Sequence, residues 1–250
     1  MNIAVCVKQV PDTETKIKIS GDKKSIDEGD INFILNPYDE FAVEEALKIK
    51  ETHGGEVTIL SLGPDRVSTA IRSALAMGAD KAIHLKTNAI PHDPMTTASA
   101  LAQVLKEGNY DLILLGKQAI DDDQQQMGPV LAEKLGYACA NVVTTLEVSE
   151  NLVNAQRQIE GGFEKVVCNL PAIVTAQRGL NEPRYASLKG IMAAKKIVIE
   201  ERTVTLEHDN IEILEINYPP QKPAGKIVGE GAEAVPELLR LLREEAKVIS

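Results

Sequence analysis

Through residues 1–137, short apolar runs alternate with longer amphipathic segments. Their periodicity predicts strands over residues 2–10, 56–63, 81–86 and 110–116, and helices over residues 35–55, 65–78, 93–108 and 124–136. Strands separated by helices need crossover connections, which place the strands parallel to one another in one sheet. The chain is therefore predicted to be an α/β protein with a Rossmann-like, mostly parallel sheet and helices on both faces.

The helix over residues 35–55 carries the clearest start signals. Asn36 is predicted as its N-cap, Pro37 as its first residue, and Asp39 favours the positive end of the helix dipole. Gly54 follows its last turn and predicts its end.

The pattern changes in the last part of the chain. Residues 140–176 hold β-branched runs punctuated by Asn and Gly, which predict an antiparallel addition, and we expect residues 171–176 to rejoin the main sheet. We expect a nucleotide-binding α/β domain at residues 1–196. Residues 197–250 are expected to form an extended C-terminal arm that ends in an amphipathic helix. The arm either docks on a partner or packs on its own domain.

Composition argues against several classes of function. The formal net charge is −10, and the chain has no Trp, three Phe and five Tyr. Neither the basic surface nor the aromatic platforms of a nucleic-acid-binding protein are therefore expected. No apolar run approaches the ~20 residues of a membrane span. The sequence opens directly into a predicted strand with no signal peptide, and its three cysteines form no CxxC pair. We expect an intracellular protein that is not embedded in a membrane.

Motifs for bond-making catalysis are not found in the sequence. The four histidines lie in different segments and form no HxH or HExxH pattern, and there is no GxSxG elbow. Neither a GxxxxGK[ST] loop nor a GxGxxG after the first strand is found. We expect a protein without its own catalysis.

The carboxyl ends of the predicted strands are the place where a nucleotide site is expected. In doubly wound sheets ligands bind beyond these ends, at the point where the strand order reverses. Four segments end there: the residues around Val7, "LNPYDE", "LSLGP" and "GKQAIDDD". We expect them to converge on one crevice.

The stretch "GKQAIDDDQQQMGP", residues 116–129, has three interpretations. Three consecutive aspartates make a poor metal site, because neighbouring side chains diverge and no second acidic cluster completes an oxygen cage. Acidic residues also suit a helix start. As a nucleotide loop, the segment offers N–H groups to a phosphate, while Gln124 and Gln126 add hydrogen bonds without charge. The nucleotide loop ranks above the metal site, and the residues alone do not name the ligand.

The stretch "LNEPRYASL", residues 180–188, has two interpretations. It forms either an ordinary surface loop or a protruding peptide in which Tyr185 and Leu188 are apolar anchors for another protein.

Taken together, these segments resemble one family, the beta (small) subunit of electron-transfer flavoprotein. The resemblance lies in "VCVKQV", "NPYDEFAVEEALKIKE", "LGP…RSALAMGADKAIHL", "DLILLGKQAIDDD" and "LPAIVTAQRGLNEPRYASLKGIMAAKK", in order over roughly residues 1–200. It implies a heterodimer with an alpha subunit that holds most of the FAD site, and a structural AMP in the beta subunit. It further implies electron transfer from acyl-CoA or other flavin dehydrogenases to a quinone oxidoreductase. A bacterial member would be cytoplasmic, and a eukaryotic one would lie in the mitochondrial matrix.

The resemblance also implies site residues. By position, the AMP site comprises Cys6, Asn36, Pro37, Tyr38, Asp39, Leu62, Gly116, Lys117, Gln118, Ala119, Ile120, Asp121, Asp122, Asp123, Gln124, Gln125, Gln126 and Met127. The dehydrogenase would be bound by a recognition loop at residues 176–196, with Leu188 as its anchor beside Tyr185, Ile191 and Met192. Tyr38 and the turn near Thr13 match positions that approach the FAD ring. Thr13 and Gln158 depart from the Tyr and the acidic residue that some relatives carry.

A second branch of the family bifurcates electrons and binds a second FAD in place of AMP. In this chain Asp122 fills the position of a glycine in that branch's loop, and Gln124 fills that of a threonine. A side chain at residue 122 restricts the approach of a pyrophosphate to the backbone, which favours AMP. An ATP-acting α/β enzyme is the rival from another class, and the sequence offers it neither a phosphate loop nor a general base.

Overall fold

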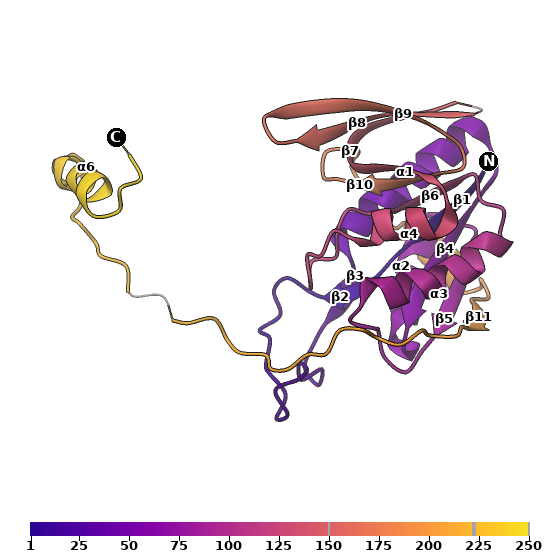
Figure 1. Cartoon of the computed structure of the whole chain (residues 1–250), viewed down its shortest axis with the longest axis horizontal. Coiled ribbons are helices and arrows are strands. Elements are labelled where there is room, and N and C mark those ends of the chain that lie inside the picture. Colours follow the sequence, from indigo (N-terminus) through magenta and orange to yellow (C-terminus); the bar gives the residue numbers. More distant parts are fainter. Residues whose placement is uncertain (150, 222–223, 250) are drawn as a thin grey trace. The chain divides into compact units, whose positions relative to one another are not determined.

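The structure is a computed structural model that describes residues 1–149, 151–221 and 224–249. Within these residues the main sheet has nine strands in the order β11-β5-β4-β1-β6-β10-β7-β8-β9 (Figure 1). The strands are β1 (Asn2–Cys6), β4 (Glu56–Gly63), β5 (Lys81–Lys86), β6 (Leu112–Gly116), β7 (Ala138–Val148), β8 (Leu152–Ile159), β9 (Gly162–Asn169), β10 (Ala172–Ala176) and β11 (Glu200–Thr203). The helices are α1 (Pro37–His53), α2 (Ser68–Met77), α3 (Pro94–Glu107), α4 (Met127–Leu135), α5 (Leu188–Ala194) and α6 (Val235–Glu244), with short 3-10 turns at Asp65–Val67 and Ala232–Ala234.

The strand order reverses beside β1. The chain passes from β1 to β4 and then to β5 on one side of β1, and it crosses back to place β6 on the other side. Strand β1 is parallel to both β4 and β6, while β8 and β9 form the antiparallel addition beyond β7. Strand β10 lies between β6 and β7 and is parallel to both, so the expectation that residues 171–176 rejoin the main sheet is confirmed.

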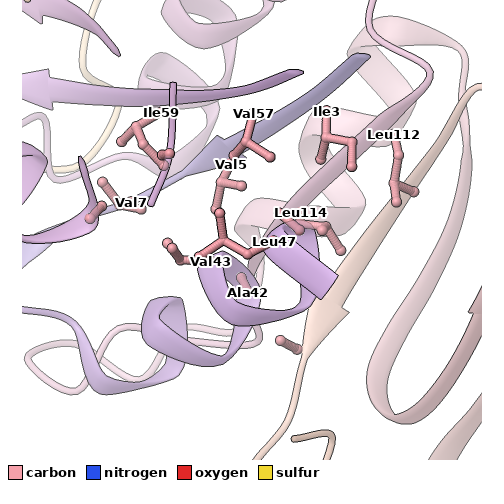
Figure 2. Packing of buried hydrophobic residues seen from close by; sticks show 14 of the residues in the cluster. Ile3, Val5, Val7, Ala42, Val43, Leu47, Val57, Ile59, Leu112 and Leu114 are labelled. Atoms are coloured by element: carbon pink, nitrogen blue, oxygen red, sulfur yellow. The ribbon is translucent and has the colours of Figure 1, made fainter. Parts of the chain in front are cut away.

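Helices cover both faces of the sheet, as predicted. Alternate residues of each parallel strand point to opposite faces. Residues such as Ile3 and Val5 pack with α1 and α2, whereas Ala4 and Cys6 pack with α3 and α4. Figure 2 shows the first of these cores, where side chains of α1 lie against those of β1, β4 and β6. The α/β fold class is confirmed.

The predicted strand over residues 2–10 is wrong in its extent. Strand β1 ends at Cys6, and β2 (Gln9–Pro11) pairs instead with β3 (Phe33–Leu35) in a separate antiparallel sheet. The cause lies at Lys8, whose backbone N–H donates to a carboxylate oxygen of Asp39 at 2.7 Å and not to a neighbouring strand. The helix expected from residue 124 is also shorter, since α4 begins at Met127.

The predicted arm begins with residues that join the main sheet. Strand β11 pairs in parallel with β5, and the chain divides into two compact units, Met1–Glu215 and Ile216–Ser250. The second unit contains α6, the amphipathic helix expected at the end of the arm. Residues 222–223 and 250 of the predicted arm lie outside the described residues. Among those described, no helix combines the length and the apolar character needed to cross a membrane.

Candidate functional site

A pocket opens at the carboxyl ends of the strands, at the reversal of strand order. Its walls come from the end of β1, the start of α1, the end of β4, the end of β6 with the loop that follows, and the β5–α3 connection. The lining residues are Cys6, Val7, Lys8, Asn36, Asp39, Leu62, Ile90, Pro91, His92, Pro94, Thr97, Leu101, Leu115, Gly116, Lys117, Gln118, Ala119, Asp122, Gln124, Gln125, Gln126 and Met127. The expected convergence at this edge is therefore present in the fold.

Asp39 ties the walls of the pocket together. Its carboxylate accepts hydrogen bonds from the N–H of Lys8 at 2.7 Å and from the N–H of Gly116 at 2.9 Å. Only glycine fits at residue 116, because a Cβ there would lie 2.5 Å from Asp39 Oδ1 and 2.6 Å from Tyr38 Cβ. Burial raises the pKa of Asp39 to about 7, against the opposing effect of its N–H donors. The ends of β1 and β6 are thus fixed to the start of α1.

Asn36 occupies the predicted N-cap position, but its side chain makes no capping bond to α1. Its Nδ2 donates to the carbonyl oxygen of Gln118 at 2.9 Å, and its Oδ1 accepts from the N–H of Ile120 at 3.2 Å. Both ends of the amide are therefore used by the loop that follows β6. The prediction of side-chain capping is wrong, and the residue instead holds one wall of the pocket.

Lys8 is paired with two aspartates of the predicted nucleotide loop. Its Nζ lies 2.8 Å from Asp121 Oδ1 and 2.8 Å from Asp122 Oδ2. Burial lowers the pKa of Lys8, but the two carboxylates outweigh it, so the pKa is raised overall. The end of β1 and the loop are joined by this ion pair, and the charge of Lys8 is already balanced.

The start of α4 differs from that of α3. At α3, the side chain of Asp93 accepts from the N–H of Met95 at 2.8 Å, whereas no side chain caps α4 at Gln126. Gln126 and Met127 line the pocket, so the uncapped first turn of α4 borders it. Gln118 Oε1 is also buried without a hydrogen-bond partner. Uncapped N–H groups at a helix start favour an anion.

Thirteen of the eighteen predicted AMP-site residues line the pocket; Pro37, Tyr38, Ile120, Asp121 and Asp123 do not. Three of these five still contact its walls, through the Ile120–Asn36 and Asp121–Lys8 bonds and a hydrogen bond from Gln118 to Asp123. Tyr38 lies outside it, with Lys117 Nζ 5.1 Å from its ring centroid.

Sequence reasoning missed the wall formed by Ile90, Pro91, His92, Pro94, Thr97 and Leu101. The signal for it was present. The segment after residues 81–86 also follows a parallel strand, so it had to emerge at the same edge.

The segment predicted as a recognition loop is fastened to the domain yet exposes apolar side chains. Arg184 binds Glu44 through Nε at 2.8 Å and Glu51 through Nη1 at 2.6 Å, and Asn181 donates to Glu45 at 2.8 Å. The exposed fractions are 100% for Tyr185, 83% for Leu188, 59% for Met192 and 40% for Ile191. The four side chains are therefore available to a partner, and binding by them stays a prediction.

The predicted flavin-facing positions lie outside the pocket. Thr13 is exposed in the turn after β2, and Gln158 on β8 accepts from Gln177 Nε2 at 3.3 Å. Within the described residues, no group of three or more His, Cys, Asp and Glu side chains is arranged to hold a metal ion.

Comparison with known proteins places these features in a family. The model of the electron transfer flavoprotein domain matches residues 24–207. The Electron transfer flavoprotein subunit beta of Bacillus subtilis is 43% identical over 263 residues, and that of Bradyrhizobium diazoefficiens is 42% identical over 253 residues. The mitochondrial subunit beta of Arabidopsis thaliana is 40% identical over 257 residues. Each match covers 100% of both chains. The chain belongs to the electron transfer flavoprotein family, in the group of its beta subunits.

Proposed function

We propose that the chain is the electron-carrier beta subunit of a heterodimeric electron transfer flavoprotein, with no bond-making catalysis of its own. In this proposal the alpha subunit holds most of the FAD, and this chain completes its surroundings. Electrons come from acyl-CoA or other flavin dehydrogenases and pass to a quinone oxidoreductase. The names of the relatives support the assignment, since they are subunits of flavoproteins from bacteria and from mitochondria. A bacterial source would place the protein in the cytoplasm, and a eukaryotic one in the mitochondrial matrix.

The pocket at the strand reversal is proposed to bind AMP as a structural ligand. The observation that carries this proposal is the uncapped start of α4 beside that pocket, which suits a single phosphate. Leu62, Leu101 and Leu115 offer apolar contact to a base, and the nearby Gln118 Oε1 lacks a hydrogen-bond partner. AMP contributes no redox chemistry, so its expected effect is to stabilise the loop between β6 and α4.

A second FAD in this pocket is the alternative. Asp122 lines the pocket and is held by Lys8, so a bulkier dinucleotide has to accommodate its side chain, whereas AMP brings only one phosphate group. This difference in bulk favours AMP. An ATP-acting enzyme is less favoured, since the described residues offer no metal-binding cluster.

The proposal is tested by purifying the complex, denaturing it and measuring the released nucleotides by chromatography. We expect one FAD and one AMP per heterodimer. Two FAD and no AMP would establish the bifurcating alternative, and ATP turnover by the isolated chain would revive the enzyme.

A further inference from the structure

An extended segment that begins in the second half of β11 runs along α3. We define the strap as residues 202–211, and its start can be followed from β11 in Figure 1. Going toward the start of α3, each contact on the helix is made by a residue further along the strap. The hydrogen bonds are Arg202 Nη1 to Glu107 Oε2 (2.9 Å), Gln103 Nε2 to the Thr205 oxygen (2.9 Å), Ser99 Oγ to Glu207 Oε2 (2.8 Å) and Thr96 Oγ1 to the His208 oxygen (3.1 Å).

The spacing explains this register. Four helical residues rise about 6 Å, and two extended residues span about 6.6 Å. The step from Gln103 to Ser99 on the helix therefore matches the step from Thr205 to Glu207 on the strap. The strap runs antiparallel to α3, and it reaches the first turn of the helix at His208 and the residues just before the helix at Asp209.

Helix α3 separates the strap from the pocket. Pro94, Thr97 and Leu101 line the pocket, while the helical positions 96, 99 and 103 bind the strap. The two sets follow the three- and four-residue spacing of separate helix faces. Helix α3 therefore lies between the strap and the pocket and contacts both.

Asp209 makes the contacts closest to the pocket. Its Oδ2 accepts from the N–H of His92 at 2.8 Å, and its Oδ1 accepts from the N–H of Asp93 at 3.0 Å. Asn210 Nδ2 donates to Asp93 Oδ2 at 2.9 Å, while Asp93 Oδ1 caps α3. Asp93 lies between the pocket residues His92 and Pro94, and both its backbone N–H and its side chain are therefore held by hydrogen bonds.

Asp209 accepts N–H groups just before α3, while the side chain of Asp93 caps the first turn of that helix. The start of α4 has no side-chain cap, so its N–H groups stay open to a phosphate. The two helix starts at this pocket are therefore not equivalent.

We propose that Asp209 is a positioning residue for the nucleotide pocket. It holds the β5–α3 wall in its binding shape through the backbone N–H groups of His92 and Asp93. The inference rests on the proposed nucleotide-binding function of the pocket, and it assigns a part of that function to a residue that does not line it.

The test uses the full heterodimer with Asp209→Ala, Asp209→Asn and the control Gln103→Ala. Nucleotide release is followed by dilution into an excess of isotope-labelled AMP. Asp209→Ala is expected to release AMP about tenfold faster, the size expected when hydrogen bonds from a charged side chain to backbone N–H groups are lost. Asp209→Asn keeps one acceptor oxygen and is expected to lie between Asp209→Ala and the wild type. Gln103→Ala removes strap contacts two turns away and is expected to match the wild type.

Equal release rates from Asp209→Ala and the wild type would overturn the inference. Equal acceleration by Gln103→Ala would overturn it as well, because the whole strap and not Asp209 would then be responsible. If the wild-type complex holds a second FAD, the assignment of AMP fails. The role of Asp209 is then tested by comparing the release rates of that FAD among the same variants. A complex without any nucleotide in the pocket would overturn both proposals.

Discussion

At the scale of single residues, the buried carboxylate of Asp39 makes stability depend on pH. Its pKa is raised from the usual 3.8 to about 7, chiefly by burial. Between about pH 4 and pH 7 the folded chain therefore keeps a proton that the unfolded chain has lost. The contribution of Asp39 to stability is complete below about pH 4 and is lost as the pH rises through about 7.

Asp39→Asn is therefore expected to flatten the fall in stability from pH 5 to pH 8, even though the amide loses one acceptor oxygen and lowers stability at every pH. Urea unfolding at pH 5, 6, 7 and 8 measures the effect. Asp111→Asn is the control, because Asp111 also accepts a backbone N–H, from Asn2 at 2.7 Å, but is exposed. A wild-type slope retained in Asp39→Asn would contradict the assignment.

Asn36 shows which properties of a single residue can be predicted from the sequence and which cannot. Its place before α1 was predictable from the following proline, and its residue type suits a cap. Its bonds are to Gln118 and Ile120, which lie 82 and 84 residues away. Local pattern holds no information on such partners, and the same applies to the pairing of Lys8 with Asp121.

At the scale of elements, the parallel strands and helices of the core follow from apolar periodicity, because each buries a face that repeats along the sequence. The position of the strap does not follow from apolar periodicity, because its contacts with α3 are made mainly by polar groups and backbone oxygens. The division of residues 2–10 into β1 and β2 could not be predicted from local pattern either, because it depends on a hydrogen bond from the N–H of Lys8 to the distant carboxylate of Asp39. Most of the pocket was thus predictable, apart from the wall that the β5–α3 connection provides.

The recognition segment yields a prediction at this scale. Helix α5 is fixed to α2, since a Cβ on Gly190 would lie 2.3 Å from the Ala76 oxygen and Arg72 Nη1 donates to the oxygen of Ala194, the last residue of α5. Leu188 at the first position of α5 is nevertheless 83% exposed. Truncating it therefore removes apolar surface without loosening the segment.

Leu188→Ala is expected to raise the KM for the complex as electron acceptor of its dehydrogenase by about tenfold or more, the effect of losing an interface anchor. The FAD and AMP contents should not change. Val198→Ala is the matched control, because Val198 is 86% exposed but lies beyond the predicted loop. Unaltered dehydrogenase kinetics in Leu188→Ala would argue against an anchoring role.

At the scale of the whole molecule, the strap and the terminal unit belong to different parts of the chain. The strap lies within Met1–Glu215, whereas α6 lies within Ile216–Ser250. Helix α6 buries Leu241, but Val235, Leu238 and Leu239 are 47%, 42% and 40% exposed. An amphipathic helix with an uncovered apolar face is typical of a docking segment. The alpha subunit is the partner that we propose for it.

Truncation after Glu215 is therefore expected to abolish co-purification with the alpha subunit, measured by affinity capture and FAD absorbance. The shortened chain keeps Asp209 and the whole pocket, so its AMP content per chain should stay close to that of the wild type. The point variant Leu238→Asp should weaken assembly in the same direction, whereas the surface variant Glu245→Gln should not. Loss of AMP together with the alpha subunit would contradict this separation, because the pocket would then depend on assembly and not on the strap.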